Sequence, residues 1–416
     1  MIDTQVIKEQ AYILGFDSVR TTTAEAFPEA EQVLKERIGR GLMEGLPWFT
    51  AERADVSCHP DALLPEARSI ISLAMCYLTE QPMETDEEAP RGRISRYAWG
   101  DDYHDIIKPR LQQFTDWLRE YARNEMGDEV ETRLFVDTGR MVDRAVAQRA
   151  GLGWYGKNTN ILTKGWGSWV FLAEIVTNLE LTPDEELKAN CGSCEICLHA
   201  CPTGALPNPY ELDSTRCISF LTIELRGSIP LELRPLMGNL IFGCDICQEV
   251  CPVNKVAERR LGLRDGIGTP VIHIDRIKKR GTTDTRPLPQ KVDFQPHKEF
   301  QPRPTVGQSP ELIPLLSLTE EQFRERFRHS PIKRAKRRGL LRNVCVALGN
   351  SGDMRAVPAL TGALHDEEPL VRGHAAWALG RIGGAESLTA LHKALEVERD
   401  EEVLKEIHYA LSAHIR

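Results

Sequence analysis

The sequence predicts an α+β protein in which an N-terminal α+β domain is followed by a ferredoxin-like domain and by all-α HEAT-like repeats. Three observations lead to this prediction. Helical and strand-like runs alternate at the start, cysteines crowd the middle, and the C-terminal part repeats. Changes in composition divide the chain into residues 1–185, 186–260, 261–325 and 326–416. We expect the third part to be an irregular, proline-rich connection rather than a domain.

The composition is that of a globular protein with an acidic surface. The 416 residues include 52 Lys and Arg against 61 Asp and Glu, so the formal net charge is −9. Taken alone, this charge argues against a nucleic-acid partner. No run approaches the roughly 20 apolar residues of a membrane helix, and the N-terminus lacks the segments of an export signal. We therefore expect a cytoplasmic monomer that does not bind a membrane.

In the N-terminal part, the sequence predicts two buried strands and two helices. Residues 67–78 and 167–179 are apolar and β-branched enough to be buried strands. Residues 102–127 have helical periodicity and end at a glycine, and residues 141–151 form a second helix that a glycine closes. This mixture predicts the α+β domain.

Seven of the eleven cysteines form two runs with a shared pattern. The first is Cys-x-x-Cys-x-x-Cys-x-x-x-Cys-Pro, and the second lacks the first cysteine of that pattern. The longer run has the spacing of bacterial ferredoxins, in which three cysteines hold one [4Fe–4S] cube and the fourth serves its neighbour. Cys217, which precedes Cys244 by 27 residues, can supply the missing thiolate. The scattered Cys58, Cys76 and Cys345 are expected to be buried apolar residues.

The ferredoxin crossover divides the eight thiolates between two clusters. The first cluster takes Cys191, Cys194, Cys197 and Cys251, and the second takes Cys201, Cys217, Cys244 and Cys247. Structural zinc is the alternative, but zinc has no use for the longer run. Two clusters form a path for single electrons. That path suits either a bare carrier or, because carriers are small, an enzyme with a redox centre elsewhere in the chain.

Two further features have both an ordinary and a functional interpretation. Residues 151–156 match G-x-G-x-x-G, but they follow a helix and lead into loop and strand, so we expect a tight loop rather than a dinucleotide site. Asp137 is either the N-cap of a helix that begins near Thr138 or a proton donor at the end of a strand. The residues alone leave both interpretations of Asp137 open.

The C-terminal part repeats. Leu348-Gly349 and Leu379-Gly380 are 31 residues apart, and Leu411 lies in a third, partial copy. Each unit is typical of two short helices with small residues at close contacts, as in HEAT-like repeats. Because fewer than three full copies rarely stand alone, we expect the array to pack on the preceding domain.

A basic segment precedes the repeats. Residues 324–342 hold nine Lys and Arg and one acid, a local charge of +8, and residues 276–280 form a second basic group. Solvated helix faces usually mix both signs, so this local field favours a phosphate backbone as the partner. The alternative is a tail that binds protein. The net charge of −9 therefore conceals a strongly basic segment.

Several segments together resemble the epoxyqueuosine reductase family. They are FVDTGRMVDRA (135–145), GWYGKNTN (153–160), GSWVFLAEI (167–175), CGSCEICLHACPTGAL (191–206), CISFLTIELRGSIP (217–230), FGCDICQEVCPVNK (242–255) and SPIKRAKRRGLLRNVCVALGNSGD (330–353). The resemblance covers nearly the whole chain and departs at about 258–295, where this chain carries extra residues. It implies the last step of queuosine synthesis, the reduction of epoxyqueuosine to queuosine at the wobble position of tRNA.

The resemblance also implies a mechanism. A cobalamin in the N-terminal domain, reduced to cob(I)alamin through two [4Fe–4S] clusters and an external one-electron donor, attacks the epoxide. Asp137 then matches the family's proton donor. Arg140 and Arg144 would favour its carboxylate form, so we expect both to face phosphate, corrin side chains or Asp143 instead.

Further residues receive a role only through the resemblance. The cofactor-binding set would be Tyr97, Asp137, Lys157, Asn158, Asn160, Ser168, Ser219 and Thr222. The anticodon stem-loop of tRNA would contact Lys333, Arg334, Lys336, Arg337 and Arg338. A reductive dehalogenase shares the cofactors but has an export signal and a membrane partner, and an electron carrier with an interaction tail is the alternative from another class.

Overall fold

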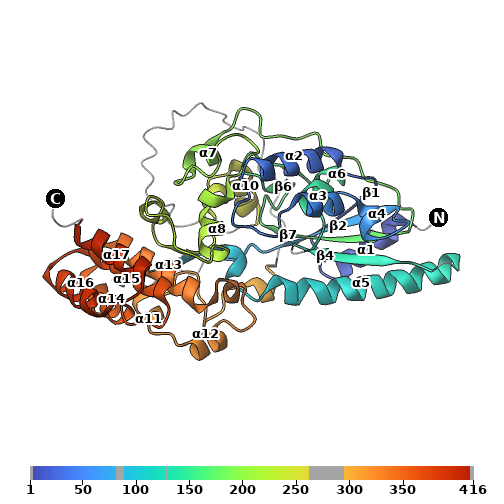
Figure 1. The fold of residues 1–416 in the computed structure, drawn as a ribbon. Coiled ribbons are helices and arrows are strands. Elements are labelled where there is room, and N and C mark those ends of the chain that lie inside the picture. Colours follow the sequence, from blue (N-terminus) through green and yellow to red (C-terminus); the bar gives the residue numbers. More distant parts are fainter. Residues whose placement is uncertain (1–2, 81–88, 128, 138, 262–294, 413–416) are drawn as a thin grey trace.

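A computed structural model describes residues 3–80, 89–127, 129–137, 139–261 and 295–412 (Figure 1). The α+β part lies at one end of the molecule, the cysteine-rich segment follows, and the C-terminal helices lie at the other end. No helix of the described residues is long and apolar enough to cross a membrane.

A four-stranded antiparallel sheet forms the centre of the N-terminal part. Its order is β1-β2-β7-β4, with β1 at Ser18–Thr23, β2 at Ser69–Cys76, β7 at Val170–Thr177 and β4 at Thr132–Val136. Every residue of β2 is buried, because helices cover both faces of the sheet. The strands expected at 67–78 and 167–179 are β2 and β7.

Separate hydrophobic clusters occupy the two faces of this sheet. One joins α1 and α5 to the sheet, and the other lies under α6 and the short helices after β1. The helices are α1 (Thr4–Ile13), α2 (Pro28–Gly39), α3 (Ala51–Ser57), α4 (Pro60–Leu63), α5 (Tyr103–Met126) and α6 (Asp143–Arg149). The α5 helix begins at the cap Asp102 and ends at Gly127, whose φ of 76° is the left-handed conformation expected of a C-cap glycine.

The sequence-based N-cap interpretation of Asp137 is wrong. The following helix, α6, begins at Asp143 and has Val142 as its N-cap, so Asp137 lies outside the helix. Asp137 instead follows β4 directly, with a φ of 47° that is uncommon for a residue with a side chain. The backbone at this position therefore turns sharply where the strand ends.

The G-x-G-x-x-G run forms a hairpin, as its context predicted. β5 (Gly153–Tyr155) pairs with β6 (Ile161–Thr163), and the Gly156 N–H donates to the Asn160 carbonyl at 2.8 Å across the loop. Gly151, with a φ of 71°, lies directly against the Glu185 carbonyl, where a β-carbon would clash. In the described structure, the next element after β6 is the strand β7 rather than a helix whose N-terminus could receive a pyrophosphate.

The cysteine-rich segment consists of short helices and one strand. They are α7 (Ile196–Ala200), α8 (Ile218–Ile223), α9 (Ile246–Glu249), α10 (Pro252–Arg260) and β8 (Leu240–Phe242). β8 pairs in parallel with β3 (Arg93–Ile94), so a segment before α5 ties this part to the α+β part. The chain from 295 to 326 contains α11 (Leu312–Leu315) and α12 (Glu320–Arg326). The basic group at 276–280 and most of the extra stretch lie outside the described residues.

Five helices joined by short connections form the C-terminal part of the described residues. They are α13 (Lys336–Ser351), α14 (Val357–Ala363), α15 (Pro369–Ile382), α16 (Ala385–Val397) and α17 (Glu401–Ser412). A β-carbon added at Gly349 would meet Trp377 at 2.7 Å, and one at Gly380 would meet Ala410 at 2.6 Å. The repeated glycines therefore lie where α13 meets α15 and α15 meets α17, as the 31-residue period predicted.

The C-terminal helices pack on the cysteine-rich segment. One hydrophobic core runs from Phe220 through Leu341 to Ile407 without interruption. Arg342 is fully buried and donates to the carbonyls of Leu221, Leu225 and Gly227 at 2.5–2.8 Å, where they need donors at the end of α8. The repeats lean on their neighbour, as expected of a short array.

Candidate functional site

Four cysteines of the proposed first cluster line one cavity. Cys191, Cys194, Cys197 and Cys251 share it with residues of the β5–β6 loop and with Pro252. Three come from the turn into α7 and the fourth from the start of α10, so cysteines of both runs meet at this cavity. Burial raises the pKa of the free Cys197 thiol to about 12, and the neighbouring cysteines add to this effect. Binding to iron would instead favour the thiolate.

The other four cysteines form a second group. Burial raises the pKa of Cys244 and Cys247 well above the ordinary range, and each is raised further by the nearby Cys217 and Cys201. Cys197 also acts on Cys247, so the two groups are neighbours. Among the described residues, no three Cys, His, Asp or Glu side chains are arranged to hold a single metal ion.

Asp137 lies on an exposed turn with one tyrosine beside it. The Tyr103 hydroxyl donates a short hydrogen bond to Asp137 Oδ2, and the Tyr103 ring stacks on Phe171 at 4.3 Å between ring centroids. Burial, followed by the negative charge of Asp137, raises the pKa of Tyr103 far above its usual range. Tyr103 therefore keeps its proton and fixes one oxygen of Asp137, which leaves Oδ1 for another partner.

Residues from all three parts of the chain meet beside Asp137. Tyr97 contacts Tyr103 edge-to-face with 6.3 Å between ring centroids. Arg334 Nε bonds Glu224 Oε1 at 2.6 Å, and the Arg334 charge acts on both tyrosines. Burial raises the pKa of Glu224 although Arg334 opposes this shift. The α+β part, the cysteine-rich segment and the basic segment thus border one site.

A buried carboxyl pair lies under α6, near Asp137. Glu174 on β7 is fully buried, and the strand register places it opposite Ser72 on β2. Asp143, at the first position of α6, is half-buried, and its charge acts on Glu174. Burial raises the pKa of Asp143 to about 7 and that of Glu174 well above its usual range, where the charge of Asp143 contributes. Burial therefore favours the protonated form of both carboxyl groups.

In the described part of the structure, neither Arg140 nor Arg144 forms a hydrogen bond or an ion pair with Asp137. Arg144 is exposed and lowers the pKa of Asp143, and it also acts on Tyr155 and Cys217. Arg140 is exposed as well. For Arg144, this matches the expectation that it faces Asp143.

The residues expected to contact cobalamin divide into three groups. Lys157 and Asn158 lie in the wall of the first cysteine cavity. Ser168 and Thr222 are buried, and their hydroxyls already bond Gln248 and the Ile218 carbonyl at 2.8 and 2.7 Å. The third group, which is partly exposed, consists of Tyr97, Asn160 and Ser219.

The basic segment is less uniform than its charge count indicated. Lys336 and Lys333 are exposed, whereas Arg337 is buried and bonds both oxygens of Asp366 at 2.5 and 3.1 Å. The structure thus places Arg337 inside the protein rather than on a surface for tRNA. Lys333 pairs with Asp102 at 2.9 Å, and Arg338 pairs with Glu368 at 3.8 Å.

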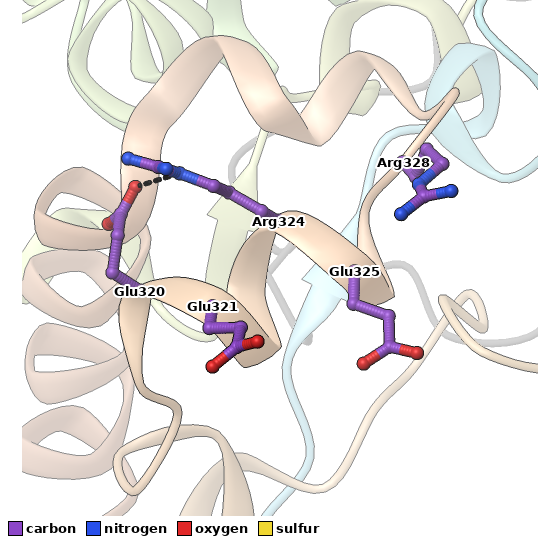
Figure 2. Close-up of a pocket in the computed structure, with 5 residues that line it drawn as sticks. All are labelled: Glu320, Glu321, Arg324, Glu325 and Arg328. Atoms are coloured by element: carbon purple, nitrogen blue, oxygen red, sulfur yellow. Dashed lines mark hydrogen bonds and ion pairs between the residues drawn. The ribbon is translucent and has the colours of Figure 1, made fainter.

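The first turn of this segment carries mixed charges. Figure 2 shows a shallow pocket over α12, in which Arg324 bonds Glu320 at 2.8 Å while Glu321 and Glu325 extend beside it. Three glutamates here oppose two arginines, because Glu320 and Glu321 lie just before the stretch that was counted as basic. This face does not favour a phosphate backbone. The positive charge that could contact a phosphate backbone is therefore confined to residues 333–338.

Comparisons with known proteins match the whole chain. Residues 58–138 match the family described as epoxyqueuosine reductase QueG, DUF1730, residues 190–254 match the 4Fe-4S double cluster binding domain, and residues 333–412 match HEAT repeats. An epoxyqueuosine reductase of Bacillus subtilis (strain 168) is 38% identical over 96% of this chain and 92% of its own length. One of Escherichia coli (strain K12) is 34% identical over 91% and 89%.

This chain belongs to the epoxyqueuosine reductase family. A solved epoxyqueuosine reductase with an epoxyqueuosine-modified tRNA-Tyr stem loop is 35% identical, with a TM-score of 0.84 over 99% of each chain. Another from Bacillus subtilis, with its catalytic aspartate loop swung out of the active site, has a TM-score of 0.83 over 99% of this chain and 98% of that one. The fold class and the double-cluster domain predicted from the sequence are confirmed.

The sequence patterns did not identify two residues of the site. Tyr103 is the first residue of a long amphipathic helix, and nothing local distinguishes it from a core aromatic. Glu174 interrupts the apolar run of β7, and a charged residue at a position that should be buried is the one signal that could have revealed it.

Proposed function

We propose that this epoxyqueuosine reductase family member reduces epoxyqueuosine in tRNA to queuosine. The observation that carries the proposal is the meeting of three elements at Asp137: a carboxyl group on an exposed turn, the cysteine-rich segment at Glu224, and the basic segment at Arg334. The reaction needs a proton donor, an electron path and a surface for RNA. The site brings together one candidate for each.

The eight cysteines would hold two [4Fe–4S] clusters in the crossover arrangement. All eight cysteines are partly exposed, but Gly192, Ser193 and Glu195, between the cysteines of the first group, are exposed, whereas Asp245 and Ile246, between Cys244 and Cys247, are buried. An external one-electron donor would therefore reach the first cluster, from which electrons would pass to the second. The second cluster would lie toward Arg144, because the Arg144 charge acts on Cys217.

Groups around α6 fit a large polar cofactor such as cobalamin. The buried Nε1 of Trp154 has no partner among the described residues, and the Arg144 charge extends from α6 to Tyr155 and Cys217. Amide groups at the rim of a corrin ring could bond both. When bound, cobalamin would supply a cobalt centre that can take up single electrons and act as a nucleophile once reduced.

Asp137 would supply the proton that the opened epoxide oxygen requires. Tyr103 holds Oδ2, so a proton on Oδ1 can face the substrate. The exposed turn at Asp137 lets a base of the tRNA approach. In the neighbouring pair, Glu174 and the Oδ1 atom of Asp143 are buried, so these oxygens are not available to the substrate.

The anticodon stem-loop would contact Lys333, Arg334, Lys336 and Arg338. Lys336 is exposed and has no charged partner among the described residues. The ion pairs of Lys333 and Arg334 involve side chains that are 52% and 37% exposed, so phosphates could replace the carboxylates. Arg337 is omitted because it is buried.

Anaerobic purification, metal analysis and turnover test this proposal. We expect iron for two cubes, bound cobalt with corrin absorption, and conversion of epoxyqueuosine-containing tRNA to queuosine when a low-potential reductant is added. Iron without cobalt, and without conversion, would favour an electron carrier. Reduction of a halogenated phenol in place of the tRNA would favour a reductive dehalogenase.

A further inference from the structure

Lys157 places a buried positive charge in the wall of the first cysteine cavity. Lys157 is only 8% exposed, and it lines the same cavity as Cys191, Cys194, Cys197 and Cys251. A buried lysine is costly unless a negative group compensates its charge. An apolar residue would fill this wall more cheaply, so the charge requires an explanation.

The loop that carries Lys157 is held firmly. The Tyr210 N–H donates to the Lys157 carbonyl at 3.0 Å, and the Asn158 amide donates to the Cys247 carbonyl at 3.2 Å. The Thr159 N–H closes the turn onto the Gly156 carbonyl at 2.9 Å. The backbone of the loop is thus bonded to the same segment that supplies the cysteines, and the ammonium cannot drift far from the cavity.

The protein compensates this charge only in part. Glu195 Oε1 lies 3.5 Å from Lys157 Nζ, but the Glu195 side chain is 46% exposed, whereas that of Lys157 is 9% exposed. Water screens the carboxylate more strongly than the ammonium, so the net contribution of this ion pair to the potential inside the cavity is positive. His199, on α7, is 3.9 Å from Glu195 and 66% exposed, and the other charged groups at the cavity are the four thiolates themselves.

We infer that Lys157 raises the reduction potential of the cluster held by Cys191, Cys194, Cys197 and Cys251. Reduction adds one electron to the cube and breaks no bond, so a nearby buried cation stabilises the reduced form more than the oxidised form. The electron comes from the external one-electron donor. The inference rests on the proposed cluster assignment, and it gives Lys157 a role at the first cluster in place of the corrin contact that the family resemblance implied.

The charge of Lys157 would thereby make the first cluster easier to reduce than it would be beside an uncharged residue. An electron from a soluble donor would then be held at the first cluster until the second cluster and the cofactor beyond it are oxidised. Lys157 is a positioning and tuning residue in this account, because it contacts neither the substrate nor the reacting atoms.

Redox titration of the full-length, cluster-loaded chain tests the inference. Each cluster gives one reduction step, which the electron paramagnetic resonance of the reduced cubes follows under anaerobic conditions. Lys157→Met should lower one of the two steps and leave the other nearly unchanged, with a reduction equilibrium constant about tenfold smaller, which corresponds to about 59 mV for one electron. Lys157→Arg keeps the charge and should restore most of the potential.

Glu195→Gln separates the electrostatic role from a structural one. Removing the carboxylate leaves the ammonium uncompensated, so the same step should move to higher potential. If the ion pair only held the loop in place, both variants would shift the step in the same direction, and the inference would be wrong. Lys164→Met, which removes an exposed lysine from the turn after β6, is the matched control and should move neither step.

Iron analysis keeps this test distinct from the proposed function. Wild-type protein that binds fewer than two cubes would overturn the cluster assignment itself. Two cubes with unchanged potentials in Lys157→Met would overturn only the role of Lys157. Should Lys157→Met lose iron, Glu195→Gln still decides, because a rise in potential supports the inference and an unchanged potential contradicts it.

Discussion

The turn after β4 and the start of α6 each carry an aspartate, six residues apart, in opposite surroundings. Asp137 is exposed, and Tyr103 holds one of its oxygens, whereas Asp143 turns Oδ1 into the protein, where its charge acts on the buried Glu174. The same contrast recurs at Lys336 and Arg337, where one neighbour is exposed and the other is buried against Asp366. Burial, rather than residue type, decides which member of each pair can meet a substrate.

Replacement of the exposed aspartate should have the largest effect. Asp137→Ala removes the proposed proton donor, and general acid catalysis contributes about 10²–10⁴-fold to a rate. We expect turnover of epoxyqueuosine-containing tRNA to fall within that range while iron and cobalt contents stay at wild-type levels. Mass spectrometry of the tRNA nucleosides measures turnover. Wild-type turnover in this variant would remove Asp137 as the donor.

Replacement of the buried arginine should affect stability instead. Arg337→Ala leaves Asp366 without its bidentate partner, and loss of one member of a buried pair costs about 3–5 kcal/mol. Thermal unfolding of the C-terminal helices should shift to lower temperature. Lys336→Ala, the exposed neighbour, should leave unfolding unchanged and lower the salt dependence of tRNA binding by about one ion. Equal effects of the two variants on both measurements would contradict the contrast.

Removal of the tyrosine that holds Asp137 should have a smaller effect on catalysis. Tyr103→Phe deletes one hydrogen bond to a charged group, worth about 1.5–3 kcal/mol, so turnover should fall roughly 10- to 100-fold. Tyr121→Phe is the control, because Tyr121 lies on the same helix and stacks on Trp117 away from Asp137. A Tyr103→Phe variant as active as its control would show that Asp137 needs no such support.

The pair of Asp143 and Glu174 should make the free energy of unfolding depend on pH. Burial raises the pKa of Asp143 from an unfolded value of 3.8 to about 7, so the folded state binds more protons than the unfolded state between these values. Stability from this group is therefore present at low pH and is lost as pH rises toward 7. Asp143→Asn should flatten that decline in urea unfolding experiments. A decline of the same slope in the variant would show that Asp143 is not its source.

Features that depend on local spacing could be predicted from the sequence. The cysteine runs, the cap at Gly127 and the repeated glycines at 349 and 380 are set by short-range geometry, and the structure places them as expected. The N-cap interpretation of Asp137 failed because α6 begins six residues later, and the role of Asp137 depends on Tyr103, which is distant in sequence.

Other features required tertiary information. The charge count over 324–342 could not show that Arg337 and Arg342 are buried. Their hydrogen-bond partners, Asp366 and backbone carbonyls after α8, lie outside that stretch of sequence. The pairing of Glu174 with Asp143 depends on the strand register and on the position of α6. The sequence motif around Lys157 indicated only a contact with a cofactor. The cavity that Lys157 lines forms from segments far apart in the chain, so the motif could not reveal it.

A single turnover with the two aspartate variants in parallel tests the account most directly. Asp137→Asn and Asp143→Asn, each loaded with both clusters and cobalamin to the same extent, are reduced once and mixed with epoxyqueuosine-containing tRNA. The account predicts that Asp143→Asn forms queuosine within about tenfold of the wild-type rate, while Asp137→Asn loses about 10²-fold or more. Loss of queuosine formation in Asp143→Asn, with formation retained in Asp137→Asn, would assign the proton to the buried pair and contradict the account.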